Sequence, residues 1–250
     1  MSLLYTSRII PTTATATSAA SGYAATNVLL QALGAPWRST ATTQQDVIID
    51  LGSAQTPRGI GVQDTNATSI VIASSPDNVT YTDRATLSLT NVDRFSRRRG
   101  CAAVNTSARY WRLRIASATP PDGLAYWRIG AVYVFGATTD IVAPQYGLTV
   151  RNNHAETRQQ LDNGREAVAA IGNRFDVING KFLVTNTGEM VIGSLLEEIR
   201  RGAVWMDLQV TQRPSWTWPL IASSATDEET MDQGTPDYTS IVLNAREVVA

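Results

Sequence analysis

The sequence has few of the residues on which disulfides, histidine metal sites and catalytic triads depend. It contains one cysteine, Cys101, and one histidine, His154. A single cysteine excludes an internal disulfide, so the fold must be stabilised by its buried core. No nucleophile motif lies beside His154, which favours a surface residue over a triad member. We interpret Cys101 as a packed thiol; a thiol made reactive by the arginines that precede it is the alternative.

Long apolar runs are also absent. No segment approaches the roughly 18 consecutive apolar residues of a membrane-spanning helix, and residues 1–10 lack the apolar stretch of a secretory signal. The sequence therefore predicts no membrane insertion, no signal peptide and synthesis in the host cytoplasm. Residues 1–140 contain no glutamate, and the pair Glu197-Glu198 consists of neighbours that point apart. Because acid–base catalysis needs facing groups, we predict that the protein is not an enzyme. The sequence also has no Walker loop, dinucleotide fingerprint or Cys-x-x-Cys motif, which predicts no cofactor.

The two halves of the chain carry opposite net charges. Residues 1–140 hold 12 arginines and 8 aspartates, a net charge of +4, and residues 141–250 hold 9 basic and 14 acidic residues, a net charge of −5. The whole chain has a net charge of −1. A chain without excess positive charge is not expected to bind nucleic acid. The difference between the halves predicts two domains, 1–140 and 141–250. It would also suit contacts between copies of the chain.

Most of the first half has the pattern of short β-strands joined by tight turns. β-Branched runs occupy residues 47–51 and 69–73, and turn-forming residues gather at 74–78 and 120–123. Residues 109–115 alternate between polar and apolar positions, which is typical of a half-buried strand. This pattern predicts a β-sandwich. A short helix within 23–34 and a last strand at 129–135, closed by Gly136, complete the prediction.

The second half predicts a different, β-rich (α+β) domain with a boundary near residues 137–145. Residues 175–185 have the pattern of a hairpin turning at Asn179-Gly180. A capping box at Ser194 predicts a short helix over 194–201. Two further strands are predicted, and they occupy 204–210 and 239–249.

Six short segments of the first half resemble the discoidin (coagulation-factor C-type) family, in the family's order. They are Ala25-Thr26-Asn27-Val28-Leu29, Trp37-Arg38-Ser39, Ile49-Asp50-Leu51-Gly52, Ser75-Pro76-Asp77, Arg109-Tyr110-Trp111-Arg112-Leu113 and Val132-Tyr133-Val134-Phe135-Gly136. The resemblance covers residues 15–137 and implies a jelly-roll β-sandwich of the galactose-binding type. Loops at one end of that fold hold sugars, lipid head groups or proteins. Many members have an acidic residue near a bound calcium in the last strand; Ala131 stands there in this chain, so we do not expect calcium.

Three groups of residues are candidates for binding. Tyr126 and Trp127 precede the last strand, where the resemblance places the ligand loops, and could form a platform for a sugar. Arg94, Arg97, Arg98 and Arg99 could bind phosphate, sulfate, an acidic partner subunit, an anionic glycan or nucleic acid, with a solvated loop as the alternative. Trp216 and Trp218 could anchor a subunit contact or belong to the core. Trp37 is interpreted as a core residue.

The second half resembles virion proteins of tailed bacteriophages in residues 188–190, 202–207 and 243–247. Our leading hypothesis is therefore a structural component of a phage-like tail or baseplate, located in the virion. Its partners would be copies of itself, other tail proteins and a cell-surface glycan. The alternative is a soluble carbohydrate-binding module protein. A glycan-active enzyme is the least favoured interpretation.

Overall fold

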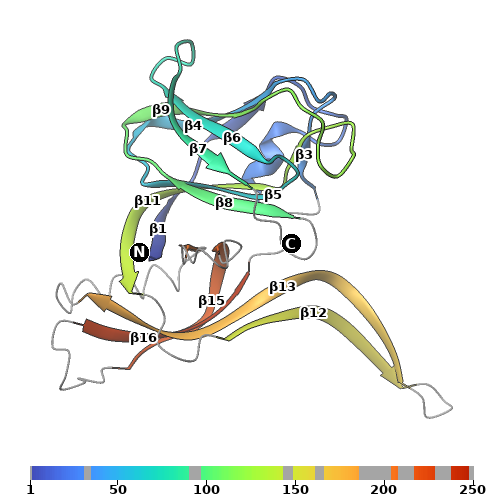
Figure 1. Cartoon of the computed structure of the whole chain (residues 1–250), viewed down its shortest axis with the longest axis vertical. Coiled ribbons are helices and arrows are strands. Elements are labelled where there is room, and N and C mark those ends of the chain that lie inside the picture. Colours follow the sequence, from blue (N-terminus) through green and yellow to red (C-terminus); the bar gives the residue numbers. More distant parts are fainter. Residues whose placement is uncertain are drawn as a thin grey trace.

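The protein is mostly β, with one short helix among the residues that the structure describes (Figure 1). The structure is a computed structural model. It describes residues 2–30, 35–89, 97–142, 149–160, 166–185, 204–207, 217–228 and 238–247. Side chains are described for residues 4–138 within these ranges, for 204–207 and for Pro219. The one helix, which is too short to cross a membrane, is the 3-10 turn η1 (Ala25–Leu29).

One sheet contains five antiparallel strands. In order across the sheet they are β2 (Thr13–Ala16), β4 (Gln45–Gln55), β9 (Ala108–Ile115), β6 (Ser69–Ser75) and β7 (Thr82–Ser88). The alternation predicted for 109–115 is confirmed, because Trp111, Leu113 and Ile115 are buried and the residues between them are partly exposed. The sheet therefore has one face in the core and one face towards solvent.

The second sheet contains nine strands from both halves of the chain. In order they are β12 (Thr149–Gln160), β13 (Glu166–Thr185), β16 (Tyr238–Glu247), β15 (Thr217–Glu228), β14 (Val204–Asp207), β1 (Ser2–Ile9), β11 (Ala131–Val142), β5 (Gly59–Thr65) and β8 (Arg98–Ala103). Its β11–β5–β8 end packs on the five-stranded sheet and completes a jelly-roll β-sandwich (Figure 1). The sandwich predicted from the sequence is confirmed.

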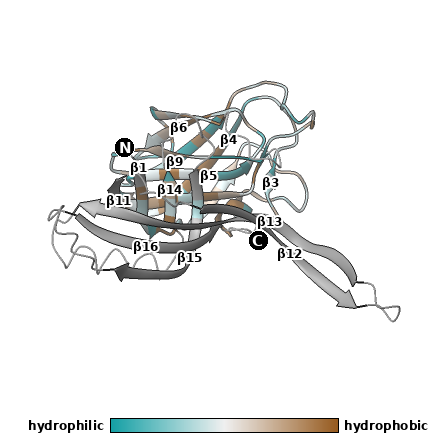
Figure 2. Cartoon of the chain, turned by 60° about the horizontal axis from the view of Figure 1, so that its bottom comes forward, coloured by the Kyte–Doolittle hydropathy of each residue, from teal (hydrophilic) through white to brown (hydrophobic). Residues whose placement is uncertain are grey.

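The main core lies between the two layers of the sandwich. Trp37 and Trp111 are its largest fully buried side chains. Each buried apolar side chain of this size contributes about 1.5–3 kcal/mol, so this core provides the stability that disulfides cannot. The sandwich strands carry both hydrophobic and hydrophilic residues, as strands with one buried face should (Figure 2). The prediction that Trp37 belongs to the core is confirmed.

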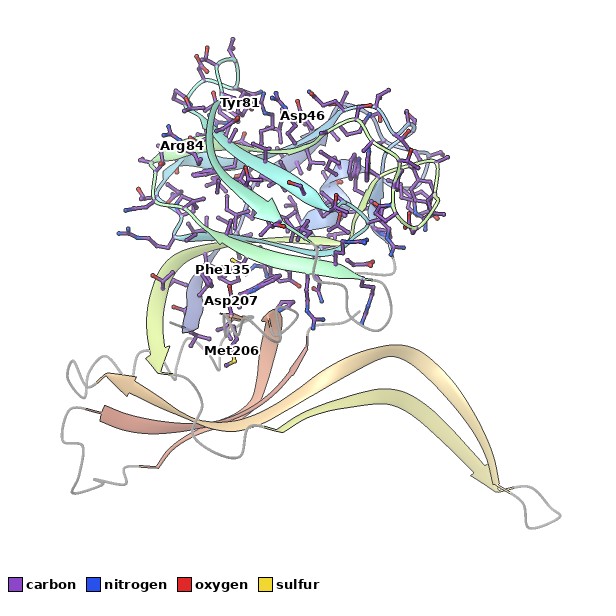
Figure 3. The ribbon with its side chains drawn as sticks, in the orientation of Figure 1. Asp46, Tyr81, Arg84, Phe135, Met206 and Asp207 are labelled. Carbon is purple, nitrogen blue, oxygen red and sulfur yellow. The ribbon has the colours of Figure 1, made fainter. Side chains whose placement is uncertain are left out.

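A second apolar cluster covers the outer face of β5 and β11. It consists of Tyr5, Ala131, Tyr133, Phe135 and Trp205, which we call the aromatic cluster. The rings of Tyr133 and Trp205 meet edge to face, with centroids 5.6 Å apart. Figure 3 shows Phe135 on the side of the sandwich that faces the C-terminal strands, near Met206 and Asp207. This outer face of the first half is therefore covered by Trp205 from the second half.

Glycine allows this close packing. A Cβ at Gly61 of β5 would lie 2.6 Å from Cε3 of Trp205, which is too close for any real contact. A Cβ at Gly59 would collide with the ring of Tyr5 in the same way. The outer face of β5 is thus flat where the two rings lie on it.

The sheet continues across the predicted domain boundary. Strand β11 runs from Ala131 to Val142, and β1 pairs with both β11 and β14. Strand β11 also pairs with β13 at Ile141 and Val142. The division at residue 140 stays a prediction. In the described part of the chain, the two halves share one hydrogen-bonded sheet.

Some strand limits differ from the predicted ones. Gly52 does not end its strand: it takes a φ of +78° within β4, beside a register shift against β9. Gly136 does not end β11, which continues to Val142. The predicted helix at 23–34 is reduced to the 3-10 turn η1, and residues 31–34 lie outside the described residues. At Gly136, the pairing of β11 with β1 overrides the local stop signal.

The predicted hairpin at 175–185 is wrong. Strand β13 runs without a turn from Glu166 to Thr185, and Asn179-Gly180 lie inside it, opposite Asn244 and Leu243 of β16. Neighbours on both sides hold this stretch extended, so the turn signal is overridden. The predicted strands at 204–210 and 239–249 correspond to β14 and β16, with different limits. The predicted helix at 194–201 lies outside the described residues.

Candidate functional site

The candidate site lies where three connecting segments meet at one end of the sandwich. These segments are residues 17–24, 39–44 and 116–127, and we call this region the loop end. A two-stranded sheet fastens it, because β3 (Trp37–Arg38) pairs with β10 (Arg128–Ile129). The indole Nε1 of Trp37 donates to the carbonyl of Ser18 at 2.9 Å. The buried Trp37 therefore anchors one loop from below.

Arg38 is the centre of the loop end. Its guanidinium carbon lies 3.9 Å from the ring centroid of Tyr23 and 5.1 Å from that of Tyr126. These distances are in the range of cation–π contacts. All three side chains are partly exposed. One cation and two aromatic rings from three segments far apart in the sequence thus form a single surface.

Backbone hydrogen bonds hold Arg38 and Tyr23 in place. The carbonyl of Arg38 accepts a hydrogen bond of 2.8 Å from the backbone N–H of Ala20. The N–H of Arg38 donates to the carbonyl of Tyr23 at 3.4 Å. The turn before η1 is therefore tied to β3 on both sides, so the stacking of Arg38 on Tyr23 follows from the backbone arrangement.

The buried side chain of Asn66 positions the segment that carries Tyr126. Its Nδ2 donates to the carbonyl of Tyr126 at 2.9 Å, and its Oδ1 accepts from the N–H of Arg128 at 2.9 Å. Nδ2 also donates to Oδ1 of Asp122 at 3.2 Å. The Asn66 amide therefore makes backbone hydrogen bonds to residues 126 and 128 of the kind that a neighbouring strand would make.

Ser39 and Trp127 fix the same segment from the other side. The N–H of Ser39 donates to the carbonyl of Trp127 at 2.9 Å, and the N–H of Trp127 donates to Oγ of Ser39 at 2.8 Å. The Trp127 indole donates to the carbonyl of Thr42 at 3.2 Å. Since Trp127 is only 2% exposed, its ring is part of the core and cannot serve as a sugar platform. Of the two aromatic candidates, only Tyr126 faces the loop end.

The carboxylates near the loop end are already bonded. Asp64 lies 3.3 Å from the Nη2 of Arg128, and its backbone is left-handed, with a φ of 54°. Asp122 accepts from the N–H of Leu124 as well as from Asn66. These contacts tighten the loops around Tyr126 and offset the charge of Arg128.

The predicted arginine cluster is only partly described. Arg98 and Arg99 begin strand β8, where Arg99 pairs with Gln63 and is 4% exposed. The interpretation as a solvated loop is therefore wrong for these two residues, and Arg97 directly precedes the strand. The N–H of Gly130 donates to the carbonyls of Gln63 and Asp64, both at 3.1 Å, so β8 starts at the same end of the sandwich as Tyr126. Arg94 lies outside the described residues.

Two other predictions concern residues beyond the loop end. Trp216 lies outside the described residues, and Trp218 lies in β15 opposite Met206 of β14. The interface role of these tryptophans stays a prediction. Cys101 packs against the aromatic cluster, and burial raises the pKa of its thiol, the reverse of what a reactive thiol needs.

No metal site emerges from the part of the chain that the structure describes. No group of three or more His, Cys, Asp or Glu side chains converges there. Ala131, at the position that is acidic in many discoidin-like domains, is fully buried in the aromatic cluster. An apolar side chain there supplies no oxygen ligand.

The outer face of the five-stranded sheet carries a second set of arginines. Two hydrogen bonds of 2.8 and 2.9 Å join Arg109 to Asp50. These bonds, together with the N–H of Gly52, hold the pKa of Asp50 below its ordinary value. Arg112 stacks on the ring of Tyr81 at 4.1 Å. Figure 3 shows Tyr81 and Asp46 on the side of the sandwich away from the C-terminal strands.

Sequence reasoning missed Tyr23, Arg38 and Asn66. Arg38 belongs to the segment Trp37-Arg38-Ser39, which carries the family resemblance. The segment indicated a role for its tryptophan but none for its arginine. Tyr23 and Asn66 have no local pattern that marks them. Their roles depend on contacts with residues about 15 and 60 positions away, respectively.

Solved structures similar to this chain include several carbohydrate-binding modules. One is chitosan-binding module 1 from a chitosanase/glucanase of Paenibacillus sp. IK-5, with 22% identity over 51% of this chain and 97% of that chain and a TM-score of 0.43. Another is the CBM32 of AlyQ in complex with 4,5-unsaturated mannuronic acid, with 19% identity over 52% and 98% of the two chains and a TM-score of 0.43.

A third similar structure is the CBM32-5 module of CpGH89 from Clostridium perfringens, in complex with GalNAc-beta-1,3-galactose. Its identity is 14% over 52% of this chain and 99% of that chain, with a TM-score of 0.44. No protein-family model matches the sequence, and no curated protein matches it.

Proposed function

We propose that this protein binds carbohydrate at the loop end and does not act as an enzyme. The observation that carries the proposal is the stacking of Arg38 on both Tyr23 and Tyr126. A sugar ring has an apolar C–H face that packs on tyrosine, and its hydroxyl groups accept hydrogen bonds from a guanidinium. The loop end offers both on one partly exposed surface.

The way the loops are held supports the same function. Asn66, Ser39 and Trp127 fix the backbone on both sides of Tyr126 before any ligand arrives. A site that is already ordered loses little conformational entropy on binding, so few direct contacts suffice for measurable affinity. This is the behaviour expected of a binding module.

A glycan array tests this proposal. The full chain and its Tyr126→Ala variant would be applied to the same array of neutral and acidic glycans. We expect the native chain to bind a related set of glycans and the variant to lose them while keeping its unfolding temperature. If the array showed no binding by the native chain, the proposal would be wrong.

A second candidate function is assembly into a phage-like tail, and the β12–β13 hairpin favours it. In the described residues, β12 pairs only with β13, and residues 166–176 of β13 pair only with β12. Figure 1 shows this pair of strands extending away from the rest of the molecule. An isolated two-stranded ribbon is marginally stable in water, so a neighbouring protein surface would stabilise it.

Light scattering on the purified chain, at low and high salt, tests the assembly function. The account expects a defined oligomer that becomes smaller when residues 157–169 are deleted, since Glu156 and Ala170 are paired and can be joined directly. Antibody labelling of tail-like particles tests the location in the virion. A native chain that stays monomeric and labels no particle would remove this candidate and leave the carbohydrate-binding function.

A further inference from the structure

Arg38, at the centre of the loop end, is a candidate for binding an anionic ligand. Arg109, Arg114 and Arg128 each pair with an aspartate at 2.8, 3.1 and 3.3 Å, respectively. Arg38 forms no ion pair with a residue that the structure describes. Its Nε is buried and has no hydrogen-bond partner there.

The two tyrosines do not replace a hydrogen-bond acceptor. Cation–π contacts act on the faces of the guanidinium, whereas its N–H donors lie in the plane at its edges. A buried donor without an acceptor is unfavourable. The stacking therefore orients Arg38 without satisfying the donors of its fork.

We infer that the loop end selects acidic sugars, and that Arg38 binds their anionic group, either a uronate carboxylate or a sulfate ester. This inference rests on the proposed carbohydrate-binding function and names the class of glycan. A planar guanidinium matches two oxygens of such a group with parallel hydrogen bonds, an arrangement that a hydroxyl cannot offer. Tyr23 and Tyr126 then contact the apolar face of the same or the adjacent sugar.

The surrounding charges agree with this selection. Arg128, directly opposite Arg38 in the β3–β10 pair, is offset by Asp64. The carboxylate of Asp122 is engaged by Asn66 and Leu124. The charge of Arg38 is therefore the one near the two rings that no described carboxylate neutralises.

A matched pair of polymers tests the inference. Polygalacturonate and the same polymer with its carboxylates reduced to alcohols differ only at C6, where a neutral CH2OH replaces the carboxylate. A sulfated galactan with its desulfated form provides the second arm. The native full chain is expected to bind at least one acidic polymer about tenfold more tightly than its neutral form, ~1.4 kcal/mol. The arm that shows this preference identifies the anionic group.

Variants separate recognition from folding. Arg38→Gln is expected to bind the acidic polymer and its neutral form with equal affinity, because the change lowers the affinity for the acidic form about tenfold more than that for the neutral form. Arg38→Lys keeps the charge and should retain part of the preference. Arg112→Gln is the matched control, since Arg112 also stacks on a tyrosine and has a buried, unpartnered Nε, but lies on the outer sheet face.

Three results would overturn the inference. One is equal affinity of the native chain for acidic and neutral polymers. Another is an equal loss of both affinities in Arg38→Gln, which would show that Arg38 only positions the two tyrosines. The last is binding of neutral glycans alone, which would leave the carbohydrate-binding function intact. Failure to bind any glycan on the array would instead overturn both.

Discussion

The side-chain amide of Asn66 holds the carbonyl of Tyr126 at 2.9 Å, from a position 60 residues earlier in the chain. The same side chain accepts the N–H of Arg128. Because Asn66 is fully buried, no water replaces these bonds when they are lost. The geometry of the loop end therefore depends on a residue that cannot itself touch a ligand.

Asn66→Ala should weaken both folding and binding. The change leaves the partly buried backbone groups of Tyr126 and Arg128 without the Asn66 amide, at a cost of about 1–3 kcal/mol. Urea unfolding measures that loss, and titration with a bound glycan measures the affinity. Asn105→Ala is the control, since Asn105 is exposed and its change should stay within about 0.5 kcal/mol. Wild-type affinity in a folded Asn66→Ala protein would contradict the positioning role.

Gly61→Ala should destabilise the protein through Trp205. The new methyl group would lie 2.6 Å from the indole, and overpacking of this kind costs about 1–3 kcal/mol. Trp205→Ala alone should cost about 3–5 kcal/mol, because it removes a buried aromatic ring. In the double variant the penalty of Gly61→Ala should largely vanish, since the ring it strikes is gone. Additive penalties in denaturant unfolding would show that the contact does not form.

A chain that ends at Val142 should expose the aromatic cluster. It retains Tyr5, Tyr133 and Phe135 but loses Trp205, which covers them. An exposed apolar patch promotes self-association and dye binding. Light scattering and a hydrophobic dye would measure both. A monomeric shortened chain with no dye binding would instead support the independent domain predicted for 1–140.

Acid should remove the contribution of Asp50 to stability. Hydrogen bonds from Arg109 hold the pKa of Asp50 below its ordinary 3.8, so the ionised form is favoured in the folded state. This stabilisation is fully present above pH 3.8 and is lost as the pH falls below that value towards the lower folded pKa. The stability difference between the native chain and Asp50→Asn should therefore shrink from about pH 7 to about pH 2.5. A difference that stays constant in urea titrations would contradict this assignment.

Local patterns predicted the sandwich better than the site. The alternation in 109–115 and the β-branched runs gave the strands of the five-stranded sheet, because one buried face imposes a period of two residues. Gly136 and Asn179-Gly180 misled the prediction, since neighbouring strands hold the chain extended through them. Gly52 misled it because β4 continues beyond the left-handed residue at this position. Tyr126 could be proposed from its place in the sequence.

The partners of Tyr126 could not be found from the sequence. Arg38 and Tyr23 meet it only after three distant segments fold together, and Asn66 acts through backbone groups that carry no sequence signal. Trp127 shows the converse. A tryptophan beside a candidate ligand residue looked like a platform, but its indole is needed in the core, where it donates to Thr42.

Calorimetric titration of the strongest glycan from the array, into the native chain and three variants, tests the central claim most directly. Tyr23→Ala and Tyr126→Ala should each weaken binding at least about tenfold, ~1.4 kcal/mol, because each removes an aromatic surface of the loop end. Arg112→Gln, on the outer sheet face, should bind like the native chain. The account is contradicted if the two tyrosine variants, still folded by circular dichroism, bind as tightly as the native chain. It is also contradicted if Arg112→Gln, and not the tyrosine variants, loses affinity for the glycan.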